Sequence, residues 1–300
     1  MQNDKLLNYL HLHFIVFIWG FTAVLGALIS IDAIPLVWFR MVLAAVFIFL
    51  YVKFKKEKLR FSKRVLAGFF LSGVIISLHW LAFFGAIKVS NVSVTLAIMS
   101  TGALFASLLE PLLYKRKIIW YEVLFGGIVV IGLYVIFKIE TQYVWGIVLA
   151  LCAAFLGALF SVINGKFALK YKASVISFYE ILFGSLCITI FLVFNQSFSI
   201  SFFQLSINDW IYLVVLASLC TAYAFIASIH VMKWISPYTV MLTINLEPVY
   251  GILLALLILG DSENMSPQFY FGAGIILMTV IANGIIKTTR ERKKRRLPNS

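Results

Sequence analysis

The stretch from Pro237 to Asp261 reads PYTVMLTINLEPVYGILLALLILGD. It is apolar and long enough to cross a bilayer, because a helical span needs roughly 20 apolar residues. Yet Asn245, Glu247 and Pro248 lie near its middle. At a rise of about 1.5 Å per residue, Glu247 lies roughly 15 Å from the start of the helix, close to the centre of a hydrocarbon core about 30 Å thick.

A carboxylate at that depth costs roughly 2.5 kcal/mol or more unless it faces protein, water or a partner. Pro248 has no N–H, so the carbonyl group of Ile244 loses its helical partner. Freed backbone groups at membrane depth are tolerated where protein buries them or a wet cavity borders them. The stretch therefore indicates a helix that lines a polar central pathway. The alternative is a structural glutamate whose charge a neighbouring helix satisfies.

The composition places the whole chain in the membrane. Apolar residues make up 62% of it and charged residues 12%, and the mean hydropathy is +1.01. These values predict an all-α integral membrane protein. The three cysteines have neither CxxC nor metal-ligand spacing, so no metal and no cofactor is expected. The chain also lacks HExxH, GxSxG and a glycine-rich phosphate loop, which argues against an enzyme.

The apolar segments predict ten transmembrane helices, joined by short loops except at 53–64 and 195–208. Their expected ranges are 10–30, 34–52, 65–86, 92–113, 119–137, 143–165, 173–194, 209–231, 237–259 and 268–287.

Lys and Arg alternate between the two sets of loops. One set carries nearly all of them: Lys5, the run 53–64, Lys115-Arg116-Lys117, Lys166, Lys170, Lys172, Lys233 and the tail 287–296. The other set carries only Lys88 and Lys138. This bias predicts cytoplasmic termini. The membrane expected is the plasma (bacterial inner) membrane. The bias also explains the net charge of +13 without nucleic acid.

The two halves of the chain share short segments in the same order. These are Val37 to Arg40 with Ser177 to Glu180, Ala86 to Lys88 with Val231 to Lys233, and Gly126-Gly127 with Gly272 and Gly274. Five helices per half is an odd number, so the second half enters from the opposite side. The prediction is two inverted five-helix repeats at 1–140 and 141–288, followed by a basic cytoplasmic tail at 289–300, with the binding site at the repeat interface.

Several motifs resemble the drug/metabolite transporter superfamily, and its EamA-type branch most closely. They are Trp19-Gly20, Arg40 after Pro35, the run N-L-E-P at Asn245 to Pro248 and L-G-D at Leu259 to Asp261. The resemblance implies a ten-helix inverted-repeat carrier with a central cavity, which exports amino acids or other small metabolites. The first half has Tyr114-Lys115-Arg116-Lys117 where the matching L-G-E ending is expected.

Arg40 and Glu180 are candidates for the site because they lie inside spans at related places of the two repeats. The guanidinium group of Arg40 suits a substrate carboxylate. The alternative is a structural link from Arg40 to Glu180 or to backbone carbonyls. Glu110-Pro111 looks like Glu247-Pro248, but the repeat offset does not superpose them, so Glu110 is assigned a structural role.

His79 and Glu247 are the candidates for carrying a proton. A histidine titrates near neutrality, although a lone helical histidine more often satisfies a neighbour's polar group. Glu247 is the better candidate, because low dielectric disfavours its charged form.

The remaining candidates could line a cavity. Asn245 could bind polar groups of a substrate, and Trp19, Trp80 and Tyr223 could form an aromatic lining. Asn91 and Asn164 lie near the ends of predicted helices, where capping is the expected role. Ala153, Gly157 and Ser161 form a stripe of small residues that predicts close helix packing.

The sequence thus predicts a secondary carrier for a small-molecule substrate, an exporter of solutes such as amino acids, proton-coupled or facilitative. A channel-like facilitator, a membrane-embedded enzyme and a scaffold remain alternatives. The partners expected are the substrate and the lipid bilayer, and the chain acts as a monomer or homodimer.

Overall fold

The structure is a computed structural model that describes residues 2–115 and 120–296, and within these ranges it contains helices and no strand. Among the described residues, nine segments of 20 to 28 residues are apolar enough to cross a membrane, and a further apolar helix, Leu124–Ile139, is shorter. The prediction of an all-α multi-pass membrane protein is therefore confirmed. Arg116 and Lys117 of one basic loop, and 297–300 of the tail, lie outside the described residues.

Helices account for nearly all of the described chain. The first half forms α1 (Gln2–Leu28), α2 (Ala33–Phe54), α3 (Lys63–Val89), α4 (Val92–Met99), α5 (Gly102–Tyr114) and α6 (Trp120–Ile139). The second half forms a short 3₁₀ turn (Thr141–Tyr143), α7 (Val144–Ala168), α8 (Ala173–Phe194), α9 (Ile200–Phe203), α10 (Ile207–Ala217), a π-turn (Ser218–Tyr223), α11 (Ala224–Val231), α12 (Pro237–Ile244), α13 (Glu247–Leu259), the turn Gly260–Glu263 and α14 (Pro267–Arg296).

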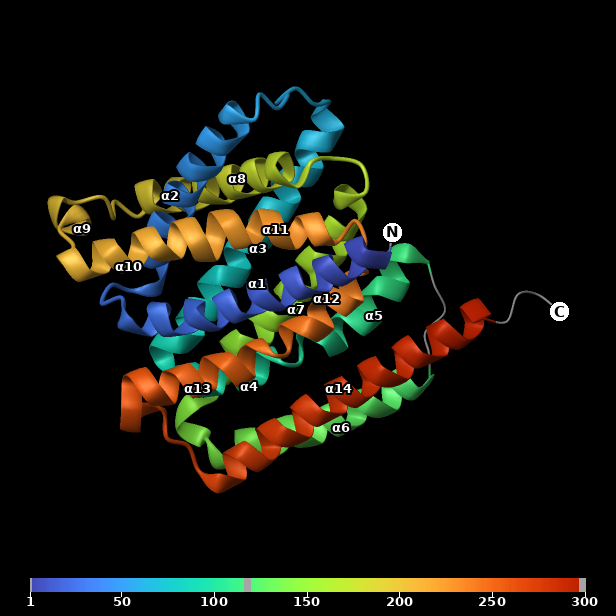
Figure 1. The fold of residues 1–300 in the computed structure, drawn as a ribbon. Helices are drawn as coiled ribbons and strands as arrows, with labels where there is room; N and C mark the ends of the chain where they lie inside the picture. The colour runs from blue at the N-terminus through green and yellow to red at the C-terminus, as the bar shows by residue number, and fades with distance from the viewer. Residues whose placement is uncertain (1, 116–119, 297–300) are drawn as a thin grey trace.

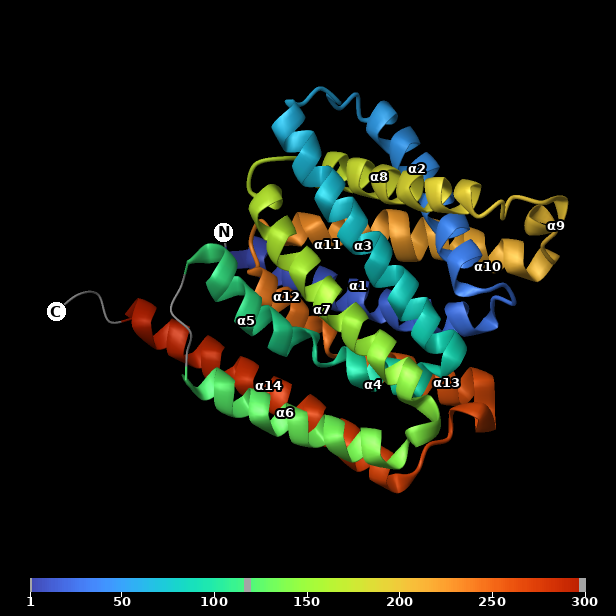
Figure 2. The ribbon, with the colours of Figure 1, turned by 180° about the vertical axis from the view of Figure 1, so that it is seen from behind.

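The first turn of α1 and the last turn of α14 lie at the same end of the bundle, the upper right in Figure 1. The connections after α2, α7 and α11 lie at this end as well (Figures 1 and 2). The connections after α1, α3 and α13 lie at the opposite end. The basic residues of 53–64, Lys170, Lys172 and Lys233 therefore gather at the end that holds both termini, which we call the basic end.

Two spans that the sequence predicts as continuous helices, 92–113 and 237–259, are each interrupted near the middle. α4 gives way to α5 at Ser100-Thr101, and α12 gives way to α13 at Asn245-Leu246. The break in 237–259 lies where the sequence places Pro248 as a helix-breaking residue, and the prediction of single helices over 92–113 and 237–259 is corrected to two shorter helices each.

A local cause can be named for each interruption. Pro248 lies in the first turn of α13, where a missing N–H is tolerated, and it cannot continue the hydrogen bonds of α12. In the first half, the Thr101 hydroxyl donates to the Ile98 carbonyl oxygen at 2.8 Å. Such local side-chain bonds compete with the helical ladder.

The two halves interlock rather than lying apart. α3 packs against α7 and α8, α2 packs against α8, and α1 packs against α11 and α13. The interrupted helices contact each other crosswise, α4 with α13 and α5 with α12. α6 and α14 form a pair along one edge of the molecule and run in opposite directions (Figures 1 and 2).

Acidic side chains tie the two halves together at the end opposite the basic end. Glu263 is buried and accepts hydrogen bonds from the backbone N–H groups of Val92 and Ser93, at 3.0 and 2.8 Å. It thereby caps the start of α4. Asp209 accepts from the N–H and hydroxyl groups of Ser30, both at 2.7 Å. These bonds close this end of the bundle across the boundary between the halves.

Candidate functional site

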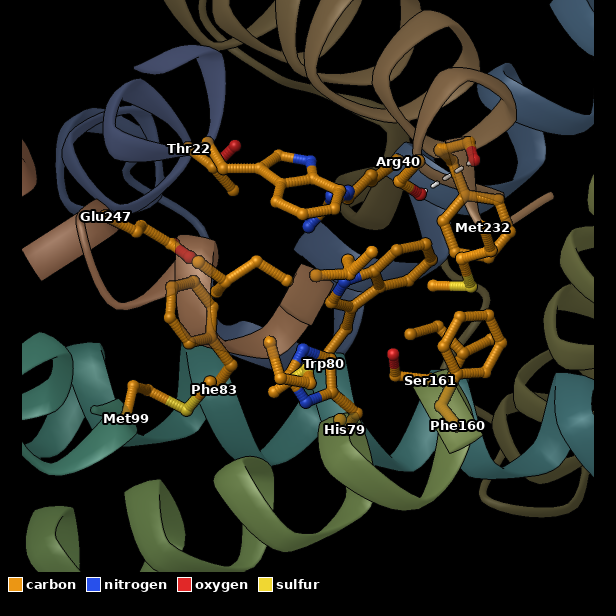
Figure 3. A pocket seen from close by; sticks show the side chains of 18 residues that line it. Thr22, Arg40, His79, Trp80, Phe83, Met99, Phe160, Ser161, Met232 and Glu247 are labelled. Atoms are coloured by element: carbon orange, nitrogen blue, oxygen red, sulfur yellow. Dashed lines mark hydrogen bonds between the residues drawn. The ribbon is translucent and has the colours of Figure 1, made fainter. Parts of the chain in front are cut away.

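A central cavity with a volume of about 100 Å³ lies between the two halves of the chain. The first half contributes residues of α1, α2, α3 and α4, and the second half contributes residues of α7, α11, α12 and α13. The polar and charged side chains in its wall are Thr22, Arg40, His79, Ser161, Ser228 and Glu247, and the rest of the wall is mainly aromatic, aliphatic and methionine side chains. Figure 3 shows the cavity from close by.

Arg40 is the cation of this cavity, and its side chain is 1% exposed. Its Nε–H donates to the hydroxyl oxygen of Thr221 at 2.7 Å, and the guanidinium group lies 4.1 Å from the centre of the Trp80 ring. The Nη1 atom is buried and has no hydrogen-bond partner. The guanidinium group is thus held on one side and has a donor left over for a ligand.

The π-turn explains how Thr221 reaches Arg40. Thr221 donates its own hydroxyl hydrogen to the carbonyl oxygen of Leu216, five residues earlier, at 2.7 Å. Thr221 lies within the π-turn Ser218–Tyr223, and π-turns often occur at functional sites. The hydroxyl oxygen of Thr221 then remains free to accept from Arg40.

Glu247 is the anion of the cavity and begins α13 directly after the interruption. Its side chain is 8% exposed, and its carboxylate points toward the interior of the cavity (Figure 3). The charges of Glu247 and Arg40 attract each other. The two residues, both of which the structure describes, nevertheless form no ion pair. The cavity therefore presents a separated positive and negative group.

His79 lines the cavity from α3, but one of its ring nitrogens is already engaged. Nδ1 lies 2.7 Å from the carbonyl oxygen of Ala153 on α7, which requires the hydrogen to be on Nδ1. A Cβ atom at Gly157 would lie 3.0 Å from the His79 ring, so the glycine makes room for it. This geometry favours the second sequence-based interpretation, a histidine that satisfies a polar group of a neighbouring helix.

Two of the three aromatic candidates line the cavity. Trp19 does so while its indole N–H donates to the carbonyl oxygen of Cys220 at 3.2 Å, and Trp80 does so beneath Arg40. Tyr223 lies elsewhere, and this expectation is corrected. It is 40% exposed on the outer side of the π-turn, and its hydroxyl group is 2.9 Å from Nε2 of His11.

Glu180 and Asn245 are buried but lie outside the lining of the cavity. Glu180 does not pair with Arg40; its Oε1 atom accepts from the amide of Asn164 at 3.0 Å. Asn245 occupies the interruption before Glu247, and its Nδ2 atom has no hydrogen-bond partner.

The structure assigns roles that the sequence did not predict. Gly157 and Ser161, expected only to pack helices, also line the cavity, and the hydroxyl group of Ser161 has no partner. Asn91 caps α4 as expected by accepting from the N–H of Val94 at 2.8 Å. Asn164 does not cap, because α7 continues past it to Ala168.

Comparisons with known proteins bear on the same two halves. The EamA-like transporter family matches residues 8–138 and, separately, residues 144–284. The chain belongs to the EamA-like transporter family. It is therefore a multi-pass membrane transporter of the drug/metabolite transporter superfamily, and each half is one EamA repeat.

A solved structure, described only as the crystal structure of a protein, shares the fold of this EamA-like chain. The two superpose with a TM-score of 0.68 over 91% of this chain and 96% of the other, at 16% sequence identity. No curated protein sequence matches the chain.

Proposed function

We propose that this EamA-like protein is a secondary carrier that exports small organic solutes bearing a carboxylate, such as amino acids, across a bacterial inner membrane. The observation that carries the proposal is the central cavity, into which Arg40 and Glu247 point without pairing. A buried guanidinium with an unpartnered nitrogen suits a carboxylate, which it can bind through two parallel hydrogen bonds. Glu247 can hold either a proton or the ammonium group of the same solute.

The aromatic wall supports a solute with an apolar part. Trp19, Trp80, Phe83, Phe160 and Phe225 line the cavity together with Met99, Met232 and Met241. An apolar wall with a few placed polar groups is the usual composition of a small-molecule site.

The proposed transport cycle uses two inverted five-helix repeats that rock against each other around this cavity. Three features support this arrangement. α6 and α14 run in opposite directions as a pair, α4–α13 and α5–α12 contact each other crosswise, and both interrupted spans occupy the fourth position of their repeat. Interrupted spans at corresponding places of two repeats are typical of transporter binding sites.

The proposed topology has ten spans, with the basic end in the cytoplasm. Both termini and most of the Lys and Arg residues lie at that end, as the bias of basic residues requires. The bonds of Glu263 and Asp209 then close the cavity on the outer side. Opening that side requires these bonds to break.

The test first has to identify the solute, because Arg40 and Glu247 indicate its chemical class but not its identity. Cells that overexpress the protein are compared with cells that lack it, and carboxylate-bearing metabolites are measured in the medium. We expect at least one to accumulate outside the overexpressing cells, and purified protein in vesicles to show saturation and counterflow with it. Flux without saturation or counterflow would favour a channel, and no change in any solute would contradict export.

A further inference from the structure

The molecule contains a second buried carboxyl group that the cavity does not use. Glu180 is 0% exposed in the middle of α8. Its Oε1 atom accepts from Asn164 on α7 at 3.0 Å, and the same amide lies 3.1 Å from the hydroxyl oxygen of Ser72 on α3. The three residues form a cluster that we call the junction cluster. It joins α3 of the first repeat to α7 and α8 of the second.

Among the described residues, no cation neutralises Glu180. The polar groups that influence it are Ser72 and Asn164, both uncharged. Three ionisable side chains on the helices packed against α8 have other partners. Arg40 donates to Thr221, His79 contacts Ala153 and Lys166 donates to Leu113. A bare carboxylate in such a place is strongly disfavoured, whereas the protonated acid carries no charge.

Several polar atoms of the cluster have no hydrogen-bond partner. Glu180 Oε2 and Asn164 Oδ1 are both buried acceptors without a partner, and the buried hydroxyl group of Ser177, three residues before Glu180, has no partner either. A proton on Oε2 would turn one of these acceptors into a donor. A metal cation fits less well, because the Asn164 amide already directs hydrogen atoms toward the carboxyl group.

The cluster lies beside a close approach of α3 and α8. A Cβ atom at Gly73 would lie 2.5 Å from the backbone oxygen of Glu180, and one at Gly184 would lie 2.7 Å from the backbone oxygen of Gly73. α3 and α8 therefore meet backbone to backbone beside the carboxyl group. A motion of one repeat against the other must change the surroundings of Glu180.

The cluster also adjoins the cavity. Asn164 follows Ser161 by three residues on α7, and Ser161 lines the cavity. The Asn164 amide lies 3.3 Å from the carbonyl oxygen of Phe160, another lining residue. A displacement of Ser161 or Phe160 in the cavity wall therefore also displaces Asn164, which lies about one helical turn further along α7.

We propose that the junction cluster is a proton-binding site, separate from Glu247, in which Glu180 carries one proton while the repeats are packed as seen here. Uptake forms one O–H bond on the carboxyl group with a proton from water, and release breaks that bond and returns the proton to water. Release follows when the junction of α3, α7 and α8 opens. Because Glu180 lies outside the lining of the cavity, its proton is exchanged by the conformational change and not by competition with the solute. This coupling role rests on the proposed carrier function, whereas the protonation of Glu180 does not.

The protonation is tested by infrared spectroscopy of purified protein, in which a protonated carboxylic acid has its own C=O band. At about pH 7 an exposed glutamate is ionised. We expect the wild-type band to persist there and to lose a component in Glu180→Gln. In Asn164→Leu the same component should shift, because its hydrogen-bond partner is gone. Glu247→Gln is the matched control and should leave this component in place.

Two results would overturn the proposal. One is an unchanged band in Glu180→Gln, which would mean that the carboxyl group is ionised. The other is a band that disappears when sodium replaces choline at constant ionic strength, which would identify a cation site instead. Neither measurement needs a transported solute, so both remain decisive if the carrier proposal fails.

The coupling role needs a solute identified by the export test. Glu180→Gln is expected to keep counterflow within about twofold of wild type and to lose its response to a pH gradient. Loss of both activities in folded Glu180→Gln protein would show a structural role only and would contradict the coupling. A full response to the gradient would contradict it as well.

Discussion

The two interrupted spans lie against each other, yet their breaks differ in chemistry. At the break between α4 and α5, the hydroxyl groups of Ser100 and Thr101 bond to carbonyl oxygens of their own preceding turn. At the break between α12 and α13, the amide nitrogen of Asn245 has no partner and Glu247 faces the cavity. The first break satisfies its own polar groups, whereas the second leaves the Asn245 amide nitrogen without a partner and turns Glu247 toward the cavity. The two repeats therefore share an interrupted span, but only the interruption in the second repeat places an ionisable side chain at the cavity.

The largest effect is expected at Arg40, whose charge acts on the second break. Arg40→Ala removes the cation that we assign to the substrate carboxylate, and we predict a loss of substrate affinity of about a hundredfold. Arg40→Lys keeps the charge but loses the planar fork and the bond to Thr221, so it should recover only part of the affinity. Substrate affinity is measured by concentration-dependent counterflow. Normal affinity in folded Arg40→Ala protein would exclude the substrate role.

Glu247→Gln removes the carboxyl group at the second break and keeps the size of the side chain. If Glu247 carries the transported proton, the variant should slow proton-driven transport by at least about tenfold and flatten its pH dependence. The measurement is initial rate in vesicles over a range of pH, beside counterflow as a control for folding and binding. A pH dependence equal to that of wild type would end the assignment of Glu247 as a proton carrier.

Substitution of two asparagines, one in each interrupted span, compares how much each side chain contributes to stability. Asn91 caps α4 by accepting from the N–H of Val94, so Asn91→Ala should lower the free energy of unfolding by about 1 kcal/mol. The Asn245 amide nitrogen has no partner, so Asn245→Ala should cost less than about half as much. Unfolding is followed by titration with a denaturing detergent. Equal costs in the two variants would show that Asn245 has a partner in solution.

The smallest effect is expected at the first break. Thr101→Val removes a hydroxyl group that bonds only within its own helix, so transport rate and pH dependence should stay within about twofold of wild type. The same vesicle measurements check this outcome. A large change in pH dependence would show that both breaks take part in coupling, and the contrast between them would fail.

Much of the fold follows from the sequence, because each span buries a long apolar run and each basic loop has to stay outside the hydrocarbon. The interruption at Ser100-Thr101 did not follow, since Ser and Thr occur within continuous helices as well. The π-turn was not predicted either, because the residues Ser218–Tyr223 are compatible with an ordinary helix.

The sequence predicted the charged residues of the site, and it predicted the uncharged residues that line the cavity less well. Arg40 and Glu247 stand out because a buried charge in a span requires a reason. The face of a helix that turns toward a cavity is harder to infer, since aromatic residues suit lipid as well. Tyr223 was misplaced for that reason. Asn164 was assigned to a cap because the predicted end of its helix was three residues too early, so the junction cluster was missed.

The position of Glu247 in the first turn of α13 has a consequence for the unloaded protein. The start of a helix carries a partial positive charge from its aligned peptide dipoles, which favours a nearby anion. In the proposed cycle, a Glu247 carboxylate that has released its proton and its solute is still partly neutralised by the backbone. The empty carrier would then return to its starting orientation without an uncompensated charge in the hydrocarbon.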